Sequence, residues 1–552
     1  MNRIAGVLIA LIVLGGGGYA AYKYFVLHEP VLPESWTQPA TTPAPTPGAP
    51  ATSETAAPPA GAAAPTMGAA EMPAVSVPAA AVDVDALIAR LPKALRVTYR
   101  AKSTDASGMT LMEGVEITNV DDPDTKVTVA RLTLSAIDLE SFERVFDYER
   151  YTDSDETFRM LVGTLIAEDF AVTSGAQPSV VRIQRLEFNA LEMKPFAFKP
   201  GGPDFEAQFK PDSDERGFQI LGMVLDAIKL GSFDMQGLNV NVPDVQLTYD
   251  IGHARLDGIN RGKFGRMRVE NIATRTTMPG MGDFTSSYEW EECEGFDLSG
   301  SIPYLLNAEM PPATATNLIW IGATTARNFK SYLPGFGRYE FSEVSSDAIT
   351  FDWLIPSSMR MRAKGTVSID PNASAEMAQA AQQLGRTDFP LEFALDWRYE
   401  GGFGNAQLNQ FLLAIDGFYG VDFGFSLSGL SLAKIVNGEE AFEALGNDII
   451  FNGAKLTITD RGGTPFLLDM YAKDMGATPE EAAQQIKMQF QMMATDPAAQ
   501  AIAKAVADFI DRPGMLIIAM IPPIPVTAMM FEAAMEDPNK VVQILGLSAE
   551  AR

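Results

Sequence analysis

Two serine patterns have a spacing that nucleophilic catalysis uses. GFSLSG at 424–429 approaches the spacing of a nucleophile elbow, and SLAK at 431–434 has a Ser-x-x-Lys spacing in which the lysine could activate the serine. However, GFSLSG has Ser428 where the second glycine belongs, and it lies inside a strand-like alternation. SLAK has no partner motif elsewhere in the chain. We therefore expect neither pattern to form a catalytic site.

Clustered carboxylates are the next candidates, because oxygen-rich clusters bind calcium. DSDE occurs at 153–156 and 212–215, and DDPD occurs at 121–124. A calcium-loop register over the second DSDE puts Met223 where the bidentate acid belongs, so we interpret these runs as solvated turns. The single cysteine, Cys293, lies among glutamates that disfavour a reactive thiolate. With only two histidines in the chain, we expect no metal, no cofactor and no enzyme.

The overall charge excludes one class of partner. The formal net charge is −28 and the isoelectric point is about 4.5. Binding to nucleic acid requires clustered Lys and Arg that neutralise phosphates, and no basic run occurs in the chain. An acidic surface also disfavours lying flat on an anionic membrane. We therefore exclude nucleic acid and expect a soluble body that is held near a membrane by a separate segment.

The N-terminus supplies that segment. Ile4–Tyr22 carries no charge and is long enough to cross a bilayer, so we predict a transmembrane anchor over 1–28. Arg3 favours a cytoplasmic N-terminus. A cleaved signal peptide is the alternative, because residues 18–20 are small enough to form a cleavage site. The Pro-, Ala- and Thr-rich composition of 29–81 predicts a disordered linker.

A repeat-containing β-rich body is predicted over 82–475. It opens with a short helix, DVDALIARL, for which Asp83 or Asp85 is the expected N-cap. Alternation of apolar and polar residues then predicts a series of strands. The clearest of them lie at 111–117, 127–134, 181–188, 238–242, 245–251, 421–432 and 454–460.

One strand pattern is repeated. VTVARLTLSAIDL at 127–139 recurs as VRIQRLEFNALEM at 181–193, and more loosely as FGRMRVENI at 264–272. The apolar phase changes around Ala130–Arg131 and again around Gln184–Arg185, which predicts a bulge or crossover at both places. Strands that are apolar on one face first and on the other face afterwards would suit a long, twisted sheet that trades faces. Stacking of such units would bury surfaces that none of them buries alone.

The aligned repeat positions are the candidates for lining a ligand groove. Their arginine could bind a headgroup, or it could pack its stem and keep its guanidinium in water, and we favour the second interpretation. The candidate positions are Val127, Val129, Arg131, Leu132, Leu134, Val181, Ile183, Arg185, Leu186, Phe188, Phe264, Arg266, Met267 and Val269.

The region 476–552 is predicted to be helical with one buried strand. Thr478 to Glu481 form a capping box, and a second helix is expected from Asp496-Pro497. The apolar stretch at 515–534 contains three prolines near its middle, which argues against a membrane span. We predict a buried strand, a break at PPIP and a short helix there, followed by a last helix over 537–546.

The first repeat unit resembles a known family. GMTLMEGVEITNVDDPDTKVTVARLTLSAIDLESF (108–142) resembles the repeating strand unit of AsmA/TamB-type envelope proteins, and GTLIAEDFAVTSGAQPSVVRIQRLEF (163–188) has the same outline. An N-terminal anchor is a shared feature. The tail is similar to the C-termini of uncharacterised α-proteobacterial envelope proteins. The resemblance implies an extended, groove-forming β-sheet with an apolar interior, of a kind that handles phospholipids between membranes.

These observations predict a mainly β (α+β) fold, with one long, curved, mostly antiparallel, repeat-built sheet and C-terminal helices. We expect a single-pass inner-membrane protein whose body lies in the periplasm and binds lipid or another apolar ligand in a β-groove, in envelope maintenance. The expected partners are the membrane, phospholipid and envelope proteins. A non-catalytic scaffold that holds envelope proteins is the alternative function, and an enzyme ranks third.

Overall fold

The computed structural model describes residues 81–90, 95–119, 125–146, 155–174, 180–196, 214–243, 246–278, 282–335, 337–370, 375–436, 448–494, 497–535 and 538–552. The predicted anchor at 1–28 and all of the linker except residue 81 lie outside the described residues. In the ranges given above, no helix is both long and apolar enough to span a bilayer.

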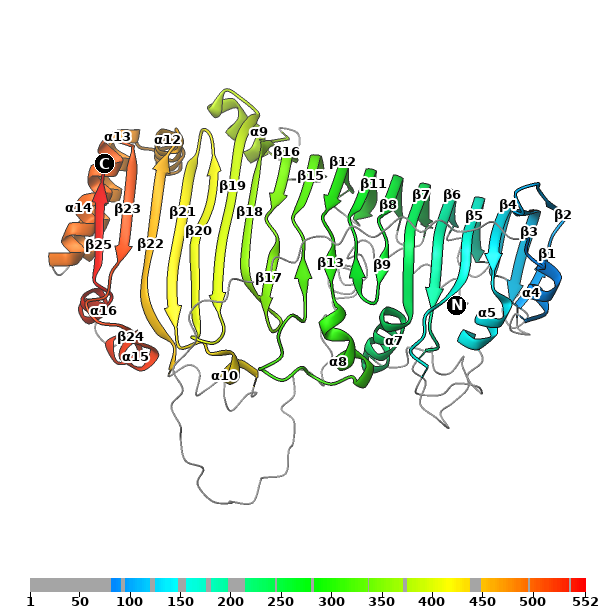
Figure 1. The fold of residues 1–552 in the computed structure, drawn as a ribbon. Coiled ribbons are helices and arrows are strands. Elements are labelled where there is room, and N and C mark those ends of the chain that lie inside the picture. The colour runs from blue at the N-terminus through cyan, green and yellow to red at the C-terminus, as the bar shows by residue number, and fades with distance from the viewer. Residues whose placement is uncertain are drawn as a thin grey trace, which may run out of the picture.

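One 25-stranded antiparallel sheet organises the described chain, and its strands lie side by side along a curved molecule (Figure 1). The predicted fold class is confirmed. At the N-terminal edge, β1 (Leu95–Thr98) and β2 (Ala101–Thr104) both pair with β3 (Thr110–Asn119). The remaining long strands follow in spatial order as β4 (Thr125–Ile137), β5 (Arg159–Ser174), β6 (Val180–Met193), β7 (Ile228–Val242), β8 (Leu247–Leu256), β11 (Met267–Met278), β12 (Gly282–Cys293), β15 (Thr324–Leu333), β16 (Gly337–Ser346), β18 (Ile355–Ser368), β19 (Asp388–Glu400), β20 (Asn405–Ile415), β21 (Tyr419–Ser428), β22 (Ile450–Asp460), β23 (Met515–Met520) and β25 (Leu547–Ala551).

Short strands extend the middle of this sheet along one edge. They pair from β7 to β18 in the order β9 (Ile259–Asn260), β10 (Lys263–Phe264), β13 (Phe296–Asp297), β14 (Trp320–Ile321) and β17 (Ile349–Asp352). Each short strand is separated by only two residues from a long strand of the same chain segment. The sheet therefore continues past a break that crosses five neighbouring strands at the same level.

Helices occupy the connections and the C-terminal end (Figure 1). The helix α4 (Val84–Arg90) precedes the first strand, and in the connections lie α5 (Leu139–Phe146), α7 (Asp214–Ala227), the 3-10 turn η4 (Ser299–Ser301), α8 (Ile302–Asn307), α9 (Ala375–Leu384) and α10 (Leu432–Val436). At the C-terminal end lie α12 (Gly463–Met475), α13 (Pro479–Met493), α14 (Pro497–Asp511), α15 (Ala528–Met535) and α16 (Pro538–Leu545). Asp83 caps α4, since its carboxylate accepts from the backbone N–H of Ala86 at 3.0 Å.

The C-terminal region completes the same sheet. The predicted capping box is present at α13, where Thr478 and Glu481 satisfy each other's backbone N–H groups. The strand, break and short helix predicted for 515–535 are also present as β23 and α15. The prediction of one buried strand is incomplete, because β24 (Val526–Thr527) and β25 also pair into the sheet. The chain beyond 475 is therefore continuous with the β-rich body.

A row of left-handed residues crosses the sheet where the sequence predicted an irregularity. In this row one residue on every second strand has a positive φ angle, namely Gly114 (+60°), Asp169 (+51°), Gly237 (+65°), Asn271 (+53°) and Asn328 (+49°). Glycine, asparagine and aspartate tolerate this conformation best. The ladder pairing skips each of these residues together with its neighbour on the next strand.

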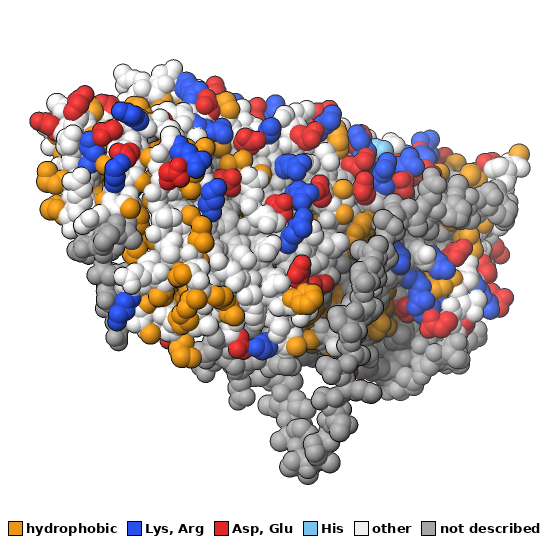
Figure 2. All heavy atoms as spheres, turned by 60° about the vertical axis from the view of Figure 1, so that its left-hand side comes forward, with side chains coloured by type: hydrophobic (Ala, Val, Ile, Leu, Met, Phe, Trp, Pro, Cys, Tyr) orange, Lys and Arg blue, Asp and Glu red, His pale blue; other side chains and the backbone are white. Residues whose placement is uncertain are grey.

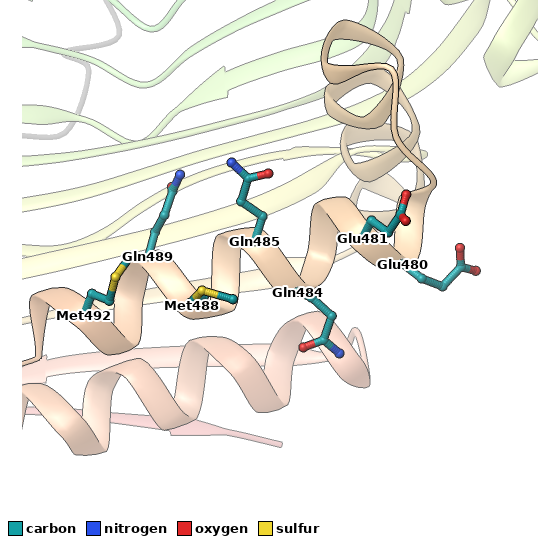
Figure 3. Close-up of a pocket in the computed structure, with 7 residues that line it drawn as sticks. All are labelled: Glu480, Glu481, Gln484, Gln485, Met488, Gln489 and Met492. Atoms are coloured by element: carbon teal, nitrogen blue, oxygen red, sulfur yellow. The ribbon is translucent and has the colours of Figure 1, made fainter.

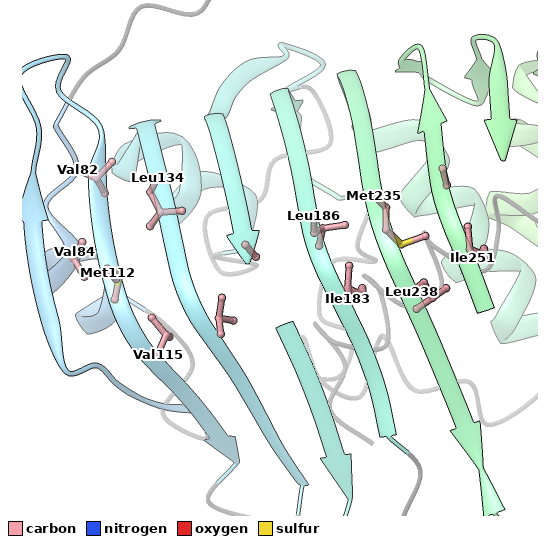
Figure 4. Packing of buried hydrophobic residues seen from close by; sticks show 13 residues of the cluster. Val82, Val84, Met112, Val115, Leu134, Ile183, Leu186, Met235, Leu238 and Ile251 are labelled. Carbon is pink, nitrogen blue, oxygen red and sulfur yellow. The ribbon is translucent and has the colours of Figure 1, made fainter. Parts of the chain in front are cut away.

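This row keeps the apolar residues on one face. Ile183 pairs with Leu238 on one side of the skipped pair, and Leu186 pairs with Met235 on the other side. All four belong to one buried cluster (Figure 4). The irregularity at Gln184–Arg185 is thus confirmed, but the predicted exchange of faces is wrong. The alternation restarts after the skipped residue, so apolar side chains three positions apart share a face.

A second row of small residues marks the break between the long and the short strands. Gly258, Gly265, Gly295 and Gly322 lie next to one another across the sheet, and the N–H of Gly322 donates to the carbonyl of Gly295 at 2.7 Å. A Cβ at Gly295 would lie 2.5 Å from the Phe264 carbonyl oxygen, and its φ is +129°. Only glycine fits this approach of two backbones without strain. We call this line of four glycines the glycine crease. It runs across the strands parallel to the first row.

Candidate functional site

The main candidate is the apolar face of the sheet. Residues that lie directly opposite each other on neighbouring strands share a face, so the pairing register defines rows that run along the molecule. We define row B by one residue from each long strand from β3 to β25. Its members are Met112, Leu132, Ala167, Leu186, Met235, Ala254, Val269, Glu291, Ala326, Val344, Ala363, Phe393, Leu413, Val421, Ile458, Leu516 and Ala551.

Two further rows flank row B on the same face. Row A contains Val115, Val129, Phe170, Ile183, Leu238, Ile251, Ile272, Tyr288, Phe329 and Phe341. Row C contains Thr110, Leu134, Leu165, Phe188, Phe233, Leu256, Met267, Cys293, Thr324, Ser346, Met361, Leu395, Phe411, Phe423, Leu456, Ile518 and Ala549. Glu291 is the one acidic residue in the three rows.

The apolar candidate positions of the first two repeat copies all lie on this face. Val129 and Ile183 fall in row A, Leu132 and Leu186 in row B, and Leu134 and Phe188 in row C. Val127 and Val181 lie two positions before row A, in register through Val172. The repeat therefore supplies equivalent positions to one continuous surface.

The third copy is not equivalent to the first two. Its strand, β11, runs antiparallel to β4 and β6, because β7 and β8 lie between β6 and β11 and every pairing is antiparallel. Met267 accordingly falls in row C and Val269 in row B, the reverse of the aligned order, and Phe264 lies beyond the glycine crease in β10. The third copy is similar in sequence, but its strand runs in the opposite direction, so its aligned residues fall in different rows.

The repeat arginines lie on the opposite, polar face. The Arg131 Nε lies 2.5 Å from Glu168, and Arg185 pairs with the same Glu168 at 3.1 Å and with Glu187 at 2.8 Å. The hydrogen bond that Arg185 donates to Glu187 raises the pKa of Arg185. Arg266 lies 3.8 Å from a carboxylate of the neighbouring strand. These contacts favour a structural role in linking strands over a role as a headgroup ligand.

Charges of the polar face are paired across strands along much of the sheet. Arg268 contacts Glu270 at 2.7 Å and Glu292 at 3.2 Å, and Arg327 contacts Glu343 at 3.4 Å. Figure 2 shows positive and negative side chains intermixed over the upper part of the view, with apolar side chains gathered below them. Each exposed pair contributes little by itself, but the pattern makes one face of the sheet hydrophilic.

The apolar face is covered by helices at its two ends. At the N-terminal end, Val84, Leu87 and Ile88 of α4 pack into the cluster that contains Ile183, which is only 1% exposed. At the C-terminal end, α14 covers rows B and C, where Ala505, Val506 and Phe509 contact Ile458, Leu516, Ile518, Ala549 and Ala551. Both ends are therefore closed by ordinary hydrophobic packing.

Between these ends, nine of the larger apolar side chains are partly or fully exposed, while smaller ones such as Ala326 and Ala363 are buried. We call this segment the open stretch and define it by Phe341, Val344, Met361, Phe393, Leu395, Phe411, Leu413, Val421 and Phe423. None of them belongs to a buried cluster formed by described residues, and Leu413 is 39% exposed. The Phe393 and Phe411 rings are 5.9 Å apart. The open stretch offers apolar and aromatic side chains to a ligand.

Glu291 lies near the middle of row B, between Val269 and Ala326 on the neighbouring strands. Burial raises the pKa of its carboxyl group. Burial also raises the pKa of Tyr249 and of Tyr288, and the charge of Glu291 adds to both shifts. Among the described residues, no basic side chain or hydrogen-bond donor is paired with Glu291. This distinguishes it from the paired acids of the polar face.

The sequence motifs considered for catalysis have structural contacts. Lys434 of SLAK forms an ion pair with Asp448, and Ser428 accepts a hydrogen bond from Asn452 at 3.1 Å. Cys293 is buried and donates to the carbonyl of Gly295. Among the described residues, no group of three His, Cys, Asp or Glu side chains could hold a metal ion. The acidic runs at 121–124 and 212–213 lie outside the described residues.

A separate surface feature lies on α13. An open hollow there is lined by Glu480, Glu481, Gln484, Gln485, Met488, Gln489 and Met492, all from this helix (Figure 3). Met488 is 57% exposed and Met492 is 69% exposed, while Leu467 and Met470 of α12 are also exposed. A hollow formed by one helix is too open to enclose a small ligand, but its methionines could contact a partner.

Sequence reasoning identified the N-terminal part of the apolar face but missed Glu291 and the open stretch. Glu291 lies in YEWEECEG, whose acids look alike in sequence, and its face follows only from its cross-strand neighbours. The alternation VDFGFSLSGLSL at 421–432 was a usable signal for the open stretch, since Val421 and Phe423 are two of its members.

Comparison with known proteins adds little functional information. A family model described as an uncharacterized protein matches residues 412–552, about a quarter of the chain. The matched segment includes part of β20, the strands β21 to β25 and the C-terminal helices. A search of curated proteins gives no match.

Proposed function

We propose that this protein binds elongated apolar ligands of the lipid type along the open stretch of its sheet. The observation that carries the proposal is the continuity of rows B and C from the helix-covered N-terminal end into partly exposed strands. Partly exposed apolar surface of this extent on a soluble body is typical of interaction sites. The opposite face carries paired charges, so that face is the hydrated one.

The sequence supports a location for this activity. The predicted anchor and linker would hold the body in the periplasm beside the inner membrane. The resemblance to AsmA/TamB-type envelope proteins agrees with a role in lipid handling or envelope maintenance. A ligand that lay along the rows would contact strands β16 to β21, where the apolar side chains are least covered.

Photo-crosslinking in cells would test the proposal on the full chain. A benzophenone amino acid at Leu413 would lie on the apolar face, and the same group at Leu412 would lie on the opposite face of the same strand. We expect lipid adducts, identified by mass spectrometry, at position 413 and not at 412. Absence of lipid adducts at 413, or equal yield at both positions, would contradict the proposal.

A scaffold function is the second candidate, and the exposed methionines of α13 with Leu467 and Met470 of α12 favour it. In this case the apolar face would still be part of the fold, and the C-terminal helices would bind a protein. The same crosslinker at Met492 would then give protein adducts of defined mass. Lipid adducts at 413 without protein adducts at 492 would support lipid binding alone.

A further inference from the structure

Glu291 is the one acidic side chain within the three apolar rows. Its strand neighbours in row B are Val269 and Ala326, neither of which can hydrogen-bond to a carboxylate through its side chain. A carboxylate that is partly removed from water is costly unless it is paired. Among the described residues no such partner exists, which is unusual in a sheet where acids such as Glu168 and Glu292 are paired with arginines.

Its position relates it to the ligand surface. Row B places Glu291 on the same face as the open stretch, three strands before β18, with Ala326 and Val344 between them. Tyr288 lies on that face as well, and its ring centroid is 4.8 Å from that of Phe329, with the two rings tilted. A ligand chain lying over Phe341 and Val344 would bring its polar end to Glu291 if it extended toward β12. The site thus combines the apolar side chains of the open stretch with one unpaired carboxylate, that of Glu291.

Resting on the proposed function, we propose that Glu291 binds the cationic amine of an amphiphile whose hydrocarbon chain lies on the open stretch. An ammonium group supplies three N–H donors and the opposite charge, so it would satisfy the carboxylate that the chain leaves unpaired. The occupant is an amine-bearing lipid, rather than an uncharged or purely anionic one. Burial of the carboxyl group strengthens the attraction, because screening by water is weaker there.

The test compares two lipids with the same acyl chains and phosphate, one of which carries a cationic amine where the other carries a neutral amide. Phosphatidylethanolamine with a fluorescent acyl chain keeps its amine, and the N-acetylated form of the same lipid keeps its chains and phosphate but loses the positive charge. Binding is measured on the full chain in an uncharged detergent. We expect the amine form to bind about tenfold more tightly. A change of this size in affinity corresponds to the free energy of one charge-assisted hydrogen bond.

Two variants connect this preference to Glu291. Glu291→Gln keeps the shape of the side chain and should bring the ratio of the two affinities close to one, without weakening binding of the N-acetylated lipid. Glu292→Gln is the matched control: it removes an equal charge from the next residue, which lies on the polar face, and it should keep the preference. Melting temperatures of both variants check that they fold.

The outcomes separate the two proposals. Equal binding of the two lipids to the wild-type chain, or a preference that survives in Glu291→Gln, would overturn the role of Glu291 and leave lipid binding intact. Failure of the wild-type chain to bind either lipid would overturn lipid binding itself, and the inference with it.

Discussion

The same apolar rows have different surroundings in two regions of the sheet. From β3 to β8 the face is buried, with α4 packed against it and side chains such as Ile183 almost inaccessible. From β16 to β21 the large side chains of the same rows are partly exposed, although Ala363 is buried, and Leu413 retains 39% of its accessible surface. The difference shows that the same rows of apolar side chains can form a buried core in one region and an exposed surface in another. Whether a row is buried depends on whether a helix packs over it.

The polar face does not differ in this way. Arg131 lies in the first region and Arg327 lies on β15, the strand directly before the second region, and each forms an ion pair with a glutamate of a neighbouring strand. Their side chains are about equally exposed, at 59% and 54%. The contrast between the regions is therefore confined to one face. That is the face on which the proposed ligand binds, and substitutions on the two faces should behave differently.

The largest expected effect compares Ile183→Asp with Leu413→Asp. Aspartate at 183 buries an unpaired charge among Leu238 and its neighbours, and should cost more than about 4 kcal/mol in the free energy of unfolding. Aspartate at 413 stays in contact with water and should cost less than about 1 kcal/mol. The measurement is the urea midpoint of each full-chain variant. Equal losses at the two positions would show that β16 to β21 are as covered as β3 to β8.

The glycine crease between the long and the short strands gives the next effect. Gly295→Val places a Cβ 2.5 Å from the Phe264 carbonyl oxygen at a φ of +129°, and should cost about 2–5 kcal/mol. Gly402→Val is the control, because nothing lies within 4 Å of a Cβ there. Thermal unfolding of both variants measures the difference. A tolerated valine at 295 would mean that the crease is not needed for the sheet to continue into its short strands.

The sequence predicts strands well but predicts their faces poorly, and the left-handed row explains why. The phase change within the repeat lies at Ala130 and Gln184, which have no positive φ, while Asp169 and Gly237 opposite them do. The cause of the phase change is thus on a neighbouring strand, which a single segment does not reveal. Without the strand pairing, a change of apolar phase along one strand predicts a change of face, which the structure does not have.

The candidate site is predictable to a different extent in the two regions. The repeat indicated Val129, Ile183 and Leu186 directly, because periodicity is a local property. Glu291 could not be distinguished from Glu292 in the same way, since only pairing with Val269 and Ala326 places it on the apolar face. β25 was missed because its five residues follow a helix and gain their stability from β23.

A pH-dependent effect sharpens the comparison at Glu291. Burial raises its pKa above the ordinary value of 4.5, so the folded chain holds this proton at a pH where the unfolded chain has lost it. The folding free energy therefore contains a penalty that is absent below the unfolded pKa and grows as pH rises through the folded pKa. Glu291→Gln removes that penalty. We expect this variant to gain stability over the wild type as the pH rises above the ordinary pKa of 4.5.

The measurement for Glu291 is the difference in urea midpoint between the two chains as a function of pH, in the absence of lipid. Glu292→Gln serves again as the control, because it removes an ion-paired carboxylate and should not gain stability with rising pH. A pH-independent difference for Glu291→Gln would indicate that its carboxyl group is well solvated in the folded chain, and the contrast with the polar face would disappear.

The smallest effects are expected on the polar face, where the two regions should agree. Arg131→Gln and Arg327→Gln each remove one exposed ion pair, and each should cost less than about 1 kcal/mol in the free energy of unfolding. Neither should change lipid crosslinking at position 413, because both side chains lie on the opposite face. A loss of lipid adducts in Arg131→Gln would instead make the repeat arginine a headgroup ligand. The ligand would then have to reach around the sheet edge, and the two faces would no longer be separate in function.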